Sequence, residues 1–260
     1  MTATPQPLYG LELDPLTMGE VLDQARTAIT ARRRFLIGVV NAAKIVTMRH
    51  DELLRNSLLE ADVLLADGQS VVWASKLLGH PLPERIAGID LFENLLEVAD
   101  RDGLSIYLLG ARSDVLDKLV DHIQTFYPGL RVAGSRDGYF TEEQSEEVAN
   151  EIVASKADML FLGITSPKKE IFLAHYGNAL GVPLLHGVGG SFDVMAGVTR
   201  RAPVLWQRAG MEWAYRLLQE PRRMWRRYLP SNTAFLALTA RERIRPTATY
   251  SRAARESIDG

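Results

Sequence analysis

The sequence predicts an α/β fold: a Rossmann-like parallel sheet with helices on both faces, plus a basic helical C-terminal appendage. Short apolar runs of strand length alternate with amphipathic stretches of helix length over most of the 260 residues. A hydrophobic content of 47% is enough for a substantial core. From residue 200 onward the chain is rich in arginine and tryptophan, with 13 Arg against 4 Glu and 1 Asp.

Five apolar runs are expected to form strands. Each is followed by Gly, Asn, Asp or Ser and then by a helical pattern, as in β–α units. In open parallel sheets, ligands bind beyond the carboxyl ends of the strands, so the loops after these runs are where we expect chemistry. The runs are residues 35–40, 63–66, 105–109, 159–162 and 182–185.

The alternating pattern ends where Arg200-Arg201-Ala202-Pro203 introduces the basic segment. We therefore divide the chain into an α/β core at residues 1–199, an Arg- and Trp-rich helical appendage at 200–245 and a C-terminal end at 246–260. The last part lacks apolar periodicity and is expected to be a loose end.

Composition excludes several classes of protein. The absence of cysteine removes thiol chemistry and disulfides. No run of about 18 apolar residues predicts a membrane-spanning helix. Residues 1–7 show no signal-peptide pattern, so we expect a protein that stays inside the cell. A phosphate-binding G-x-x-x-x-G-K-[ST] motif is also absent, which excludes a P-loop NTPase.

Asp67 directly follows a predicted strand and precedes Gly68, which lets the backbone turn there. A carboxylate in this place can accept a proton from an attacking hydroxyl. The alternative is that Asp67 caps the helix that begins near Gln69. Asn41 has the equivalent place after the first strand, where it could hold sugar hydroxyls or cap a helix. Arg85 could pair with a phosphate or form a surface salt bridge.

Glycine-bearing loops after two other strands suggest an anion site. Gly110, and Gly187-Val188-Gly189-Gly190, would let backbone N–H groups approach a phosphate where a helix begins. The second loop is not a dinucleotide fingerprint, because Phe192 stands where the last glycine should be. The one Asp-x-Asp, Asp100-Arg101-Asp102, ends a helix at the wrong edge of the sheet for a ligand, so we expect no metal site.

The basic segment from Trp206 to Tyr228 mixes arginines with Trp and Tyr, the composition of an interfacial helix on an anionic membrane. Arg216, Arg223 and Arg226 are spaced so that they share one helix face, where they could clamp a diphosphate or only meet lipid. Nucleic acid is not expected as a partner, because no recognition motif is present.

Taken together, the motifs resemble the WecG/TagA/CpsF glycosyltransferase family, in order and spacing, over about residues 35–230. The matching elements are the Asn41 loop, Ala66-Asp67-Gly68, Glu84-Arg85-Ile86-Ala87-Gly88, Leu109-Gly110, Tyr127-Pro128-Gly129, Asp137-Gly138-Tyr139-Phe140, Pro167-Lys168-Lys169-Glu170, Gly189-Gly190-Ser191-Phe192-Asp193, Arg201-Ala202-Pro203, Glu212-Trp213, Tyr215-Arg216-Leu217 and Glu220-Pro221-Arg222-Arg223.

The resemblance implies an inverting, metal-independent transfer from a UDP-sugar to a polyprenyl-diphosphate-linked acceptor in cell-surface polysaccharide or exopolysaccharide synthesis. The protein would be peripherally attached to the inner face of the cell membrane, with no cofactor besides the donor and with self-association left open. Asp67 is then the catalytic base, and Asn41 and Arg85 are pocket residues. The nucleotide would lie on Gly110, Tyr139, Gly163, Gly189, Gly190, Phe192 and Asp193, and the diphosphate under Arg216, Arg223 and Arg226.

Two pocket positions depart from the family. Val39 stands where better-known members carry threonine, and Lys169 stands where they carry glutamine. Lys169 could read an anionic group on the sugar, such as a uronic carboxylate, or it could be a solvated residue at a helix N-terminus. The departures also leave a second function open, a membrane-attached nucleotide-sugar-binding protein without catalysis.

Overall fold

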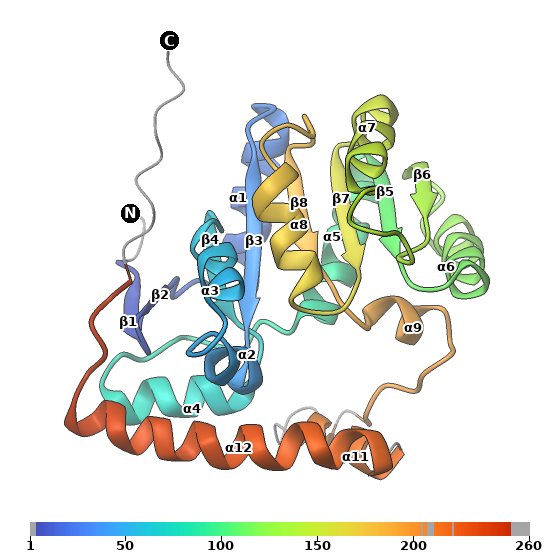
Figure 1. Ribbon diagram of the computed structural model, residues 1–260. Helices are drawn as coiled ribbons and strands as arrows, with labels where there is room; N and C mark the ends of the chain where they lie inside the picture. The colour runs from blue at the N-terminus through green and yellow to red at the C-terminus, as the bar shows by residue number, and fades with distance from the viewer. Residues whose placement is uncertain (1–3, 204, 207–210, 220, 251–260) are drawn as a thin grey trace.

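The computed structural model describes residues 4–203, 205–206, 211–219 and 221–250. Its centre is a six-stranded sheet with the order β4-β3-β8-β7-β5-β6, in which every neighbouring pair is parallel (Figure 1). The predicted α/β class with a C-terminal helical segment is confirmed. The strands are β3 (Phe35–Val40), β4 (Val63–Ala66), β5 (Ser105–Gly110), β6 (Arg131–Arg136), β7 (Met159–Gly163) and β8 (Leu184–Gly187).

Four of the five predicted strands agree closely with β3, β4, β5 and β7. The fifth begins two residues later than residues 182–185, because Pro183 precedes the ladder and offers it only its carbonyl, which accepts from Phe35 N at 2.7 Å. Sequence patterns missed β6, a half-exposed edge strand, and a short antiparallel hairpin of β1 (Gln6–Leu8) and β2 (Leu11–Leu13).

Helices cover both faces of the sheet, as the sequence predicts. Alternate strand residues separate the core into two layers: Leu36 and Val40 face one, and Ile37 and Val39 face the other. On the first face lie α2 (Ala42–Thr47), α3 (Glu52–Leu59), α4 (Gln69–Leu78), α7 (Ser145–Ser155) and α8 (Lys168–Tyr176); on the second lie α1 (Met18–Thr30), α5 (Gly88–Asp102), α6 (Ser113–Phe126) and α9 (Ser191–Met195).

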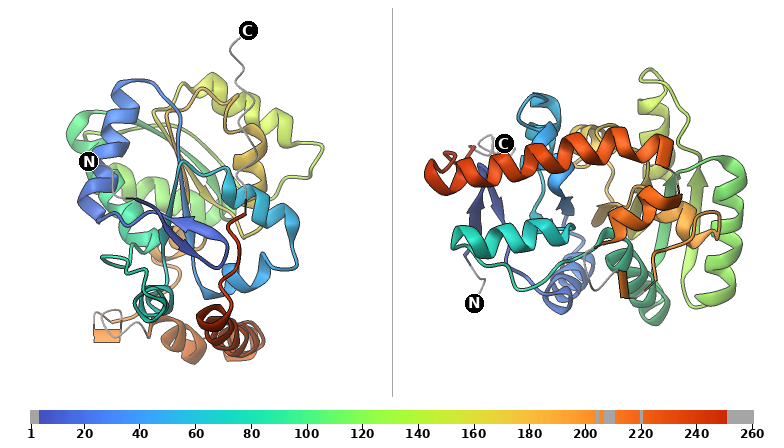
Figure 2. Two further views of the ribbon diagram at one scale, coloured as in Figure 1. Left: turned by 90° about the vertical axis from the view of Figure 1, so that its left-hand side faces the viewer. Right: turned by 90° about the horizontal axis from the view of Figure 1, so that it is seen from below.

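The C-terminal segment forms α11 (Glu212–Gln219) and α12 (Pro221–Ile244), which run along the end of the sheet toward which the strands point (Figures 1 and 2). Helix α12 packs against α2 and α4. It is fastened by Phe235, whose buried ring lies 5.4 Å from that of Tyr9, and by Thr239, which is hydrogen-bonded to the Tyr9 hydroxyl at 2.7 Å. That residues 200–245 form a unit apart from the core stays a prediction.

Residues 246–250 are not the loose end that the sequence suggested. Tyr250 N donates to Gly10 O at 2.8 Å, and the guanidinium of Arg55 lies 4.9 Å from the Tyr250 ring. These residues have no regular secondary structure, and Tyr250 bonds to the β1–β2 turn at Gly10. Residues 251–260 lie outside the described part of the chain. No helix within the described ranges has the length and apolar character needed to span a membrane.

Candidate active site

Asp67 and Asn41 come together at the carboxyl ends of the neighbouring strands β4 and β3. The Asp67 carboxylate accepts two hydrogen bonds, from Gly88 N at 3.0 Å and from the Asn41 side-chain amide at 3.4 Å. Gly88 is the first residue of α5, so the carboxylate lies at the positive end of a helix dipole. The side chain is partly exposed at this edge of the sheet. Asp67 is therefore a carboxylate that is held in place and still open to a ligand.

The capping alternative for Asp67 is wrong. Helix α4 begins after Gly68, which is its N-cap and offers no side chain to the helix. The carboxylate instead bonds to the start of α5, 21 positions away in sequence. A backbone bond from Asp67 N to Val40 O at 2.9 Å fixes the turn itself.

Asn41 caps a helix and also contacts Asp67. Its side-chain oxygen accepts from Lys44 N at 3.1 Å as the N-cap of α2, which confirms the capping alternative. The amide nitrogen of the same side chain is left to donate to Asp67. The cap therefore sets which atom of Asn41 faces the carboxylate.

Lys44 of α2 and Lys169 and Glu170 of α8 form a buried charged cluster, which we call the buried cluster. Lys44 Nζ is 2.8 Å from the Glu170 carboxylate and Lys169 Nζ is 3.8 Å from it, and the three side chains are only 9–10% exposed. Lys44 also donates to the Val39 carbonyl at 2.6 Å. Burial raises the pKa of Glu170, but the two lysines outweigh it and hold that pKa below its ordinary value. The Glu170 carboxylate is therefore ionised at neutral pH.

The alternative that Lys169 is a solvated helix residue is wrong, because its side chain is buried. Its amine donates to Gly187 O at 3.4 Å and would lie 3.2 Å from a Cβ placed on Gly189. Lys169 therefore lies directly beneath the loop after β8. A cavity of about 30 Å³, room for one water molecule, adjoins the buried cluster and the inward-facing Val39.

His186 on β8 is a buried titratable group that sequence patterns did not single out. Its Nδ1 is 3.2 Å from Ile37 O, and its Nε2 faces the backbone of Gly88 at the start of α5. Complete burial, with smaller effects from Lys169 and Lys44, lowers the pKa of His186 to about 4. The imidazole is therefore neutral in the folded protein, between the sheet and the start of α5.

Arg85 belongs to a second group of charges, which joins the core to the C-terminal segment. We call it the bridging cluster; its members are Arg85, Asp90, Glu93, Arg201 and Glu212. Arg85 is 2.6 Å from the Glu212 carboxylate and 3.7 Å from that of Asp90. Arg201 pairs with Asp90, and lies 3.5 Å from Glu93 and 3.7 Å from Glu212. The salt-bridge alternative for Arg85 is confirmed, but the pair is only partly exposed and links distant parts of the chain.

The glycines expected at a nucleotide lie along the same edge of the sheet. Gly110 and Gly163 are partners in the β5–β7 ladder, and a Cβ on Gly110 would lie 2.5 Å from the Gly163 backbone. A Cβ on Gly163 would in turn lie 2.2 Å from the Phe192 ring. Gly189 has a positive φ of 57°, which bends the loop that runs on through Gly190 into α9. These glycines allow close contact of the backbone at the strand ends.

Phe192 corrects one expectation. Its ring is fully buried and packs 5.6 Å from that of Phe92 in the core, so the side chain does not line an open nucleotide site. Its spacing beside two glycines could not show which way the ring points. Tyr139, in contrast, is exposed, and Asp193 lies partly exposed in the first turn of α9.

Arg112 is a further basic residue at this edge that the sequence reasoning missed. A hydrogen bond to Asp114 raises the pKa of Arg112, and the nearby Tyr139 and Asp193 contribute to the same rise. Arg112 therefore lies near the two residues expected at the nucleotide, in an exposed ion pair with Asp114 at 2.7 Å. Its place in the loop between β5 and α6, two residues after Gly110, was the signal that could have found it.

Asp100 and Asp102 lie at the opposite edge, as expected. Asp102 pairs with Arg26 at 2.8 Å, and Asp100 accepts from Gly129 N at 2.6 Å, just before β5 begins. Within the described ranges, no three His, Asp or Glu side chains converge as ligands for a metal ion.

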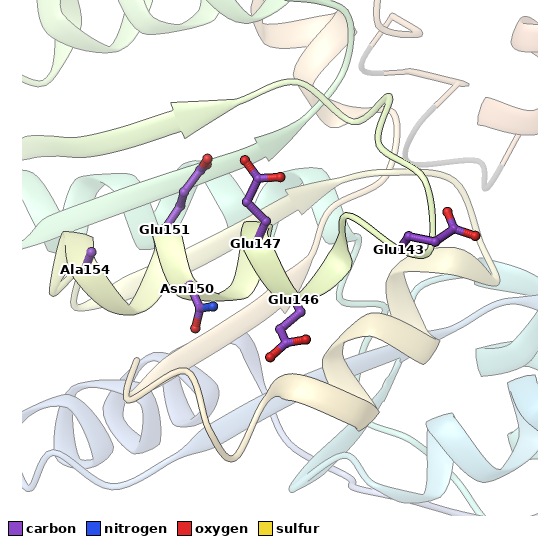
Figure 3. Close-up of a pocket in the computed structure, with 6 residues that line it drawn as sticks. All are labelled: Glu143, Glu146, Glu147, Asn150, Glu151 and Ala154. Carbon is purple, nitrogen blue, oxygen red and sulfur yellow. The ribbon is translucent and has the colours of Figure 1, made fainter.

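An open hollow of about 620 Å³ lies along α7, and none of the residues around Asp67 lines it (Figure 3). It is acidic, and Arg136 engages two of its carboxylates, those of Glu147 and Glu151. Its charge would repel a diphosphate, so we do not place a ligand there. Its lining residues are Glu143, Glu146, Glu147, Asn150, Glu151 and Ala154.

The lid arginines cannot be placed against this site. Arg216 is in α11, and Arg223 and Arg226 are in α12, but their side chains lie outside what the structure describes. Their role at a diphosphate stays a prediction.

Comparison with known proteins agrees with this arrangement. The chain matches the Glycosyl transferase WecG/TagA/CpsF family over residues 6–249. It is 39% identical, over 194 residues, to the N-acetylglucosaminyldiphosphoundecaprenol N-acetyl-beta-D-mannosaminyltransferase of Bacillus spizizenii (strain ATCC 23059 / NRRL B-14472 / W23). The match covers 75% of this chain and 74% of that relative. The chain therefore belongs to the WecG/TagA/CpsF family of glycosyltransferases.

Proposed function

We propose that this glycosyltransferase moves a sugar from a UDP-sugar to a polyprenyl-diphosphate-linked acceptor, with inversion and without a bound metal. The observation that carries the proposal is the Asp67 carboxylate, which Gly88 N–H and Asn41 hold at the carboxyl end of the sheet. The relative from Bacillus spizizenii is named for transfer to a lipid-diphosphate-linked sugar, which supports the acceptor class. Cell-surface polysaccharide synthesis is the process in which such a product is used.

In this mechanism Asp67 accepts the proton of the acceptor hydroxyl as its oxygen attacks the anomeric carbon. The bond from that carbon to the donor phosphate breaks on the opposite face, and its electron pair leaves with UDP. The leaving diphosphate is stabilised by the loop N–H of Gly190, since Gly189 N already donates to Leu162 O at 3.1 Å, and by Arg216, Arg223 and Arg226. Because these groups supply the positive charge, turnover should survive EDTA.

The other pocket residues are assigned to the substrates. Asn41 is held by its cap so that its amide can contact a sugar hydroxyl beside Asp67. Gly110, Gly163, Tyr139 and Asp193 lie along the β5–β7 side, where we place the nucleotide. We place the protein at the inner face of the membrane, with the basic appendage against anionic lipid.

Lys169 is assigned to selection of the sugar. Its amine beneath the Gly189 loop adds a positive charge that the family glutamine would lack. If that charge reads an anionic sugar, Lys169→Gln should lower the ratio of kcat/KM for a uronic over a neutral UDP-sugar. An unchanged ratio would remove this assignment and leave Lys169 as a partner of Glu170.

The test of the function is UDP release from UDP-N-acetylmannosamine, other UDP-sugars and UDP-uronic acids, with a lipid-linked N-acetylglucosamine acceptor. Acceptor-dependent release that persists in EDTA supports the proposal. UDP-sugar binding without release would instead identify the alternative, a membrane-attached binding protein without catalysis.

A further inference from the structure

The bridging cluster is built from two distant parts of the chain. Arg85 and Glu212 are 127 positions apart in sequence, and their side chains meet at 2.6 Å. Arg85, Asp90 and Glu93 come from the core, whereas Arg201 and Glu212 come from residues 200–245, the appendage. Glu212 lies in the first turn of α11, so its carboxylate fixes where that helix begins against the core.

The same cluster is connected to Asp67 through a short piece of backbone. Ile86 N donates to Ala66 O at 2.9 Å, which ties the Arg85 loop to the last residue of β4. Gly88 N then donates to the Asp67 carboxylate at 3.0 Å, and Asp90 in the first turn of α5 faces Arg85 and Arg201. The guanidinium of Arg85 and the carboxylate of Asp67 are therefore positioned by one loop.

The chemistry of the bridging cluster gives Glu212 a particular role. Arg85 is the most buried side chain of the cluster, at 13% exposed, and its short contact is to Glu212. A guanidinium presents its donors in a rigid planar fork, so a partner on one edge fixes the direction of the others. Arg201 is turned toward Asp90 and Glu93, and its Nε is 3.7 Å from Glu212, beyond hydrogen-bond range.

We propose that Glu212 is a positioning residue for sugar transfer: from the appendage it orients the guanidinium of Arg85, whose loop also carries the Gly88 N–H that holds Asp67. This inference rests on the proposed function. Glu212 does not act on the substrate itself. It acts through Arg85, and this distinguishes it from a residue that only stabilises the fold.

The test is a double-mutant cycle of Glu212→Gln and Arg85→Ala, read as kcat/KM for the lipid-linked acceptor. Glu212→Gln alone should lower kcat/KM about tenfold, an ordinary coupling for residues in contact. In the Arg85→Ala background the same change should have an effect of less than about twofold. Glu212→Asp, which keeps the charge, should recover part of the activity.

Glu93→Gln is the matched control, because it removes a carboxylate that contacts Arg201 and leaves the Arg85–Glu212 pair intact. It should change kcat/KM less than about twofold. An undiminished loss from Glu212→Gln in the Arg85→Ala background would overturn the positioning role, as would full activity of Glu212→Gln alone.

Failure of the proposed function would be seen separately, as a wild-type protein that transfers no sugar. The affinity for UDP would then be measured by calorimetry for the wild type, the two single variants and the double variant of the same cycle. Coupling between the two sites of more than about twofold would support the positioning role, and smaller coupling would overturn it.

Discussion

Two groups of charges are linked to the Asp67 site, one through Asn41 and one through the loop from Arg85 to Gly88, and they differ in burial and in what they connect. The buried cluster of Lys44, Lys169 and Glu170 joins α2 to α8 inside the core, with side chains 9–10% exposed. The bridging cluster around Arg85 joins α5 to the appendage, with side chains 13–40% exposed. The first therefore belongs to the buried interior of the core, and the second to a partly exposed contact between the core and the appendage.

Burial also determines how much stability the protein loses when one member of a cluster is removed. Removal of one partner from a buried ion pair leaves a desolvated charge behind, which destabilises a protein strongly. Water and salt reach a half-exposed cluster, so the loss of one member is compensated in part. The two clusters should therefore respond differently to mutation, pH and salt.

The largest effect is expected from Lys44→Met. It leaves the Glu170 carboxylate with Lys169 at 3.8 Å as its remaining lysine, in place of Lys44 at 2.8 Å. The free energy of unfolding should fall by about 3–5 kcal/mol, measured by urea denaturation. Lys118→Met, at an exposed lysine, should change it by less than about 0.5 kcal/mol. Similar small losses in both variants would remove the distinction between the clusters.

His186 beneath the site makes stability depend on pH. Its folded pKa of about 4 is below the ordinary value of 6.5, so protonation favours the unfolded chain. The contribution of neutral His186 to the free energy of unfolding is fully present above pH 6.5. As the pH falls from 6.5 toward 4, about 3 kcal/mol of that free energy is lost.

Urea denaturation of His186→Gln at several pH values checks this dependence. The loss of stability between pH 6.5 and 4 should become smaller in that variant and should persist in His50→Gln, at an exposed histidine. Glu170 should add a further loss at lower pH, because its depressed pKa makes its contribution disappear only as the pH falls through that value. An unchanged slope in His186→Gln would contradict the account.

The smallest effect is expected from the bridging cluster. Arg201→Gln should lower the free energy of unfolding by about 1 kcal/mol at low salt, because its partners are partly exposed. In about 1 M NaCl the difference from wild type should nearly disappear, whereas that of Lys44→Met should remain. A salt-independent loss in Arg201→Gln would mean that the bridging cluster behaves like the buried one.

Most of the sheet could be predicted from the sequence, because four of its strands are apolar on both faces and stand out as continuous runs. Strand β6, Arg131–Arg136, could not, since an edge strand with half-exposed residues carries no such run. The β1–β2 hairpin has strands too short for a periodic signal. The start of β8 was misjudged because apolar composition continues through Pro183, which cannot donate to the ladder.

The site was predicted in part. Post-strand position was enough to select Asp67 and Asn41, because parallel strands bring their carboxyl ends to one edge. Local spacing could not show that the Asp67 carboxylate bonds to Gly88 and not to α4, or that Arg85 meets Glu212. Those contacts depend on the path of the chain between distant segments, and single-sequence patterns do not contain it.

The central claim is that Asp67 is the base of sugar transfer, and Asp67→Asn tests it most directly. The amide keeps an oxygen for the Gly88 N–H bond but cannot accept the acceptor proton. Single-turnover transfer and UDP-sugar affinity should be measured on the same preparation, with Asp121→Asn, at an exposed aspartate, as the control. We predict that transfer falls by about 10²–10⁴-fold while affinity changes less than about twofold. Transfer at the wild-type rate would contradict the claim.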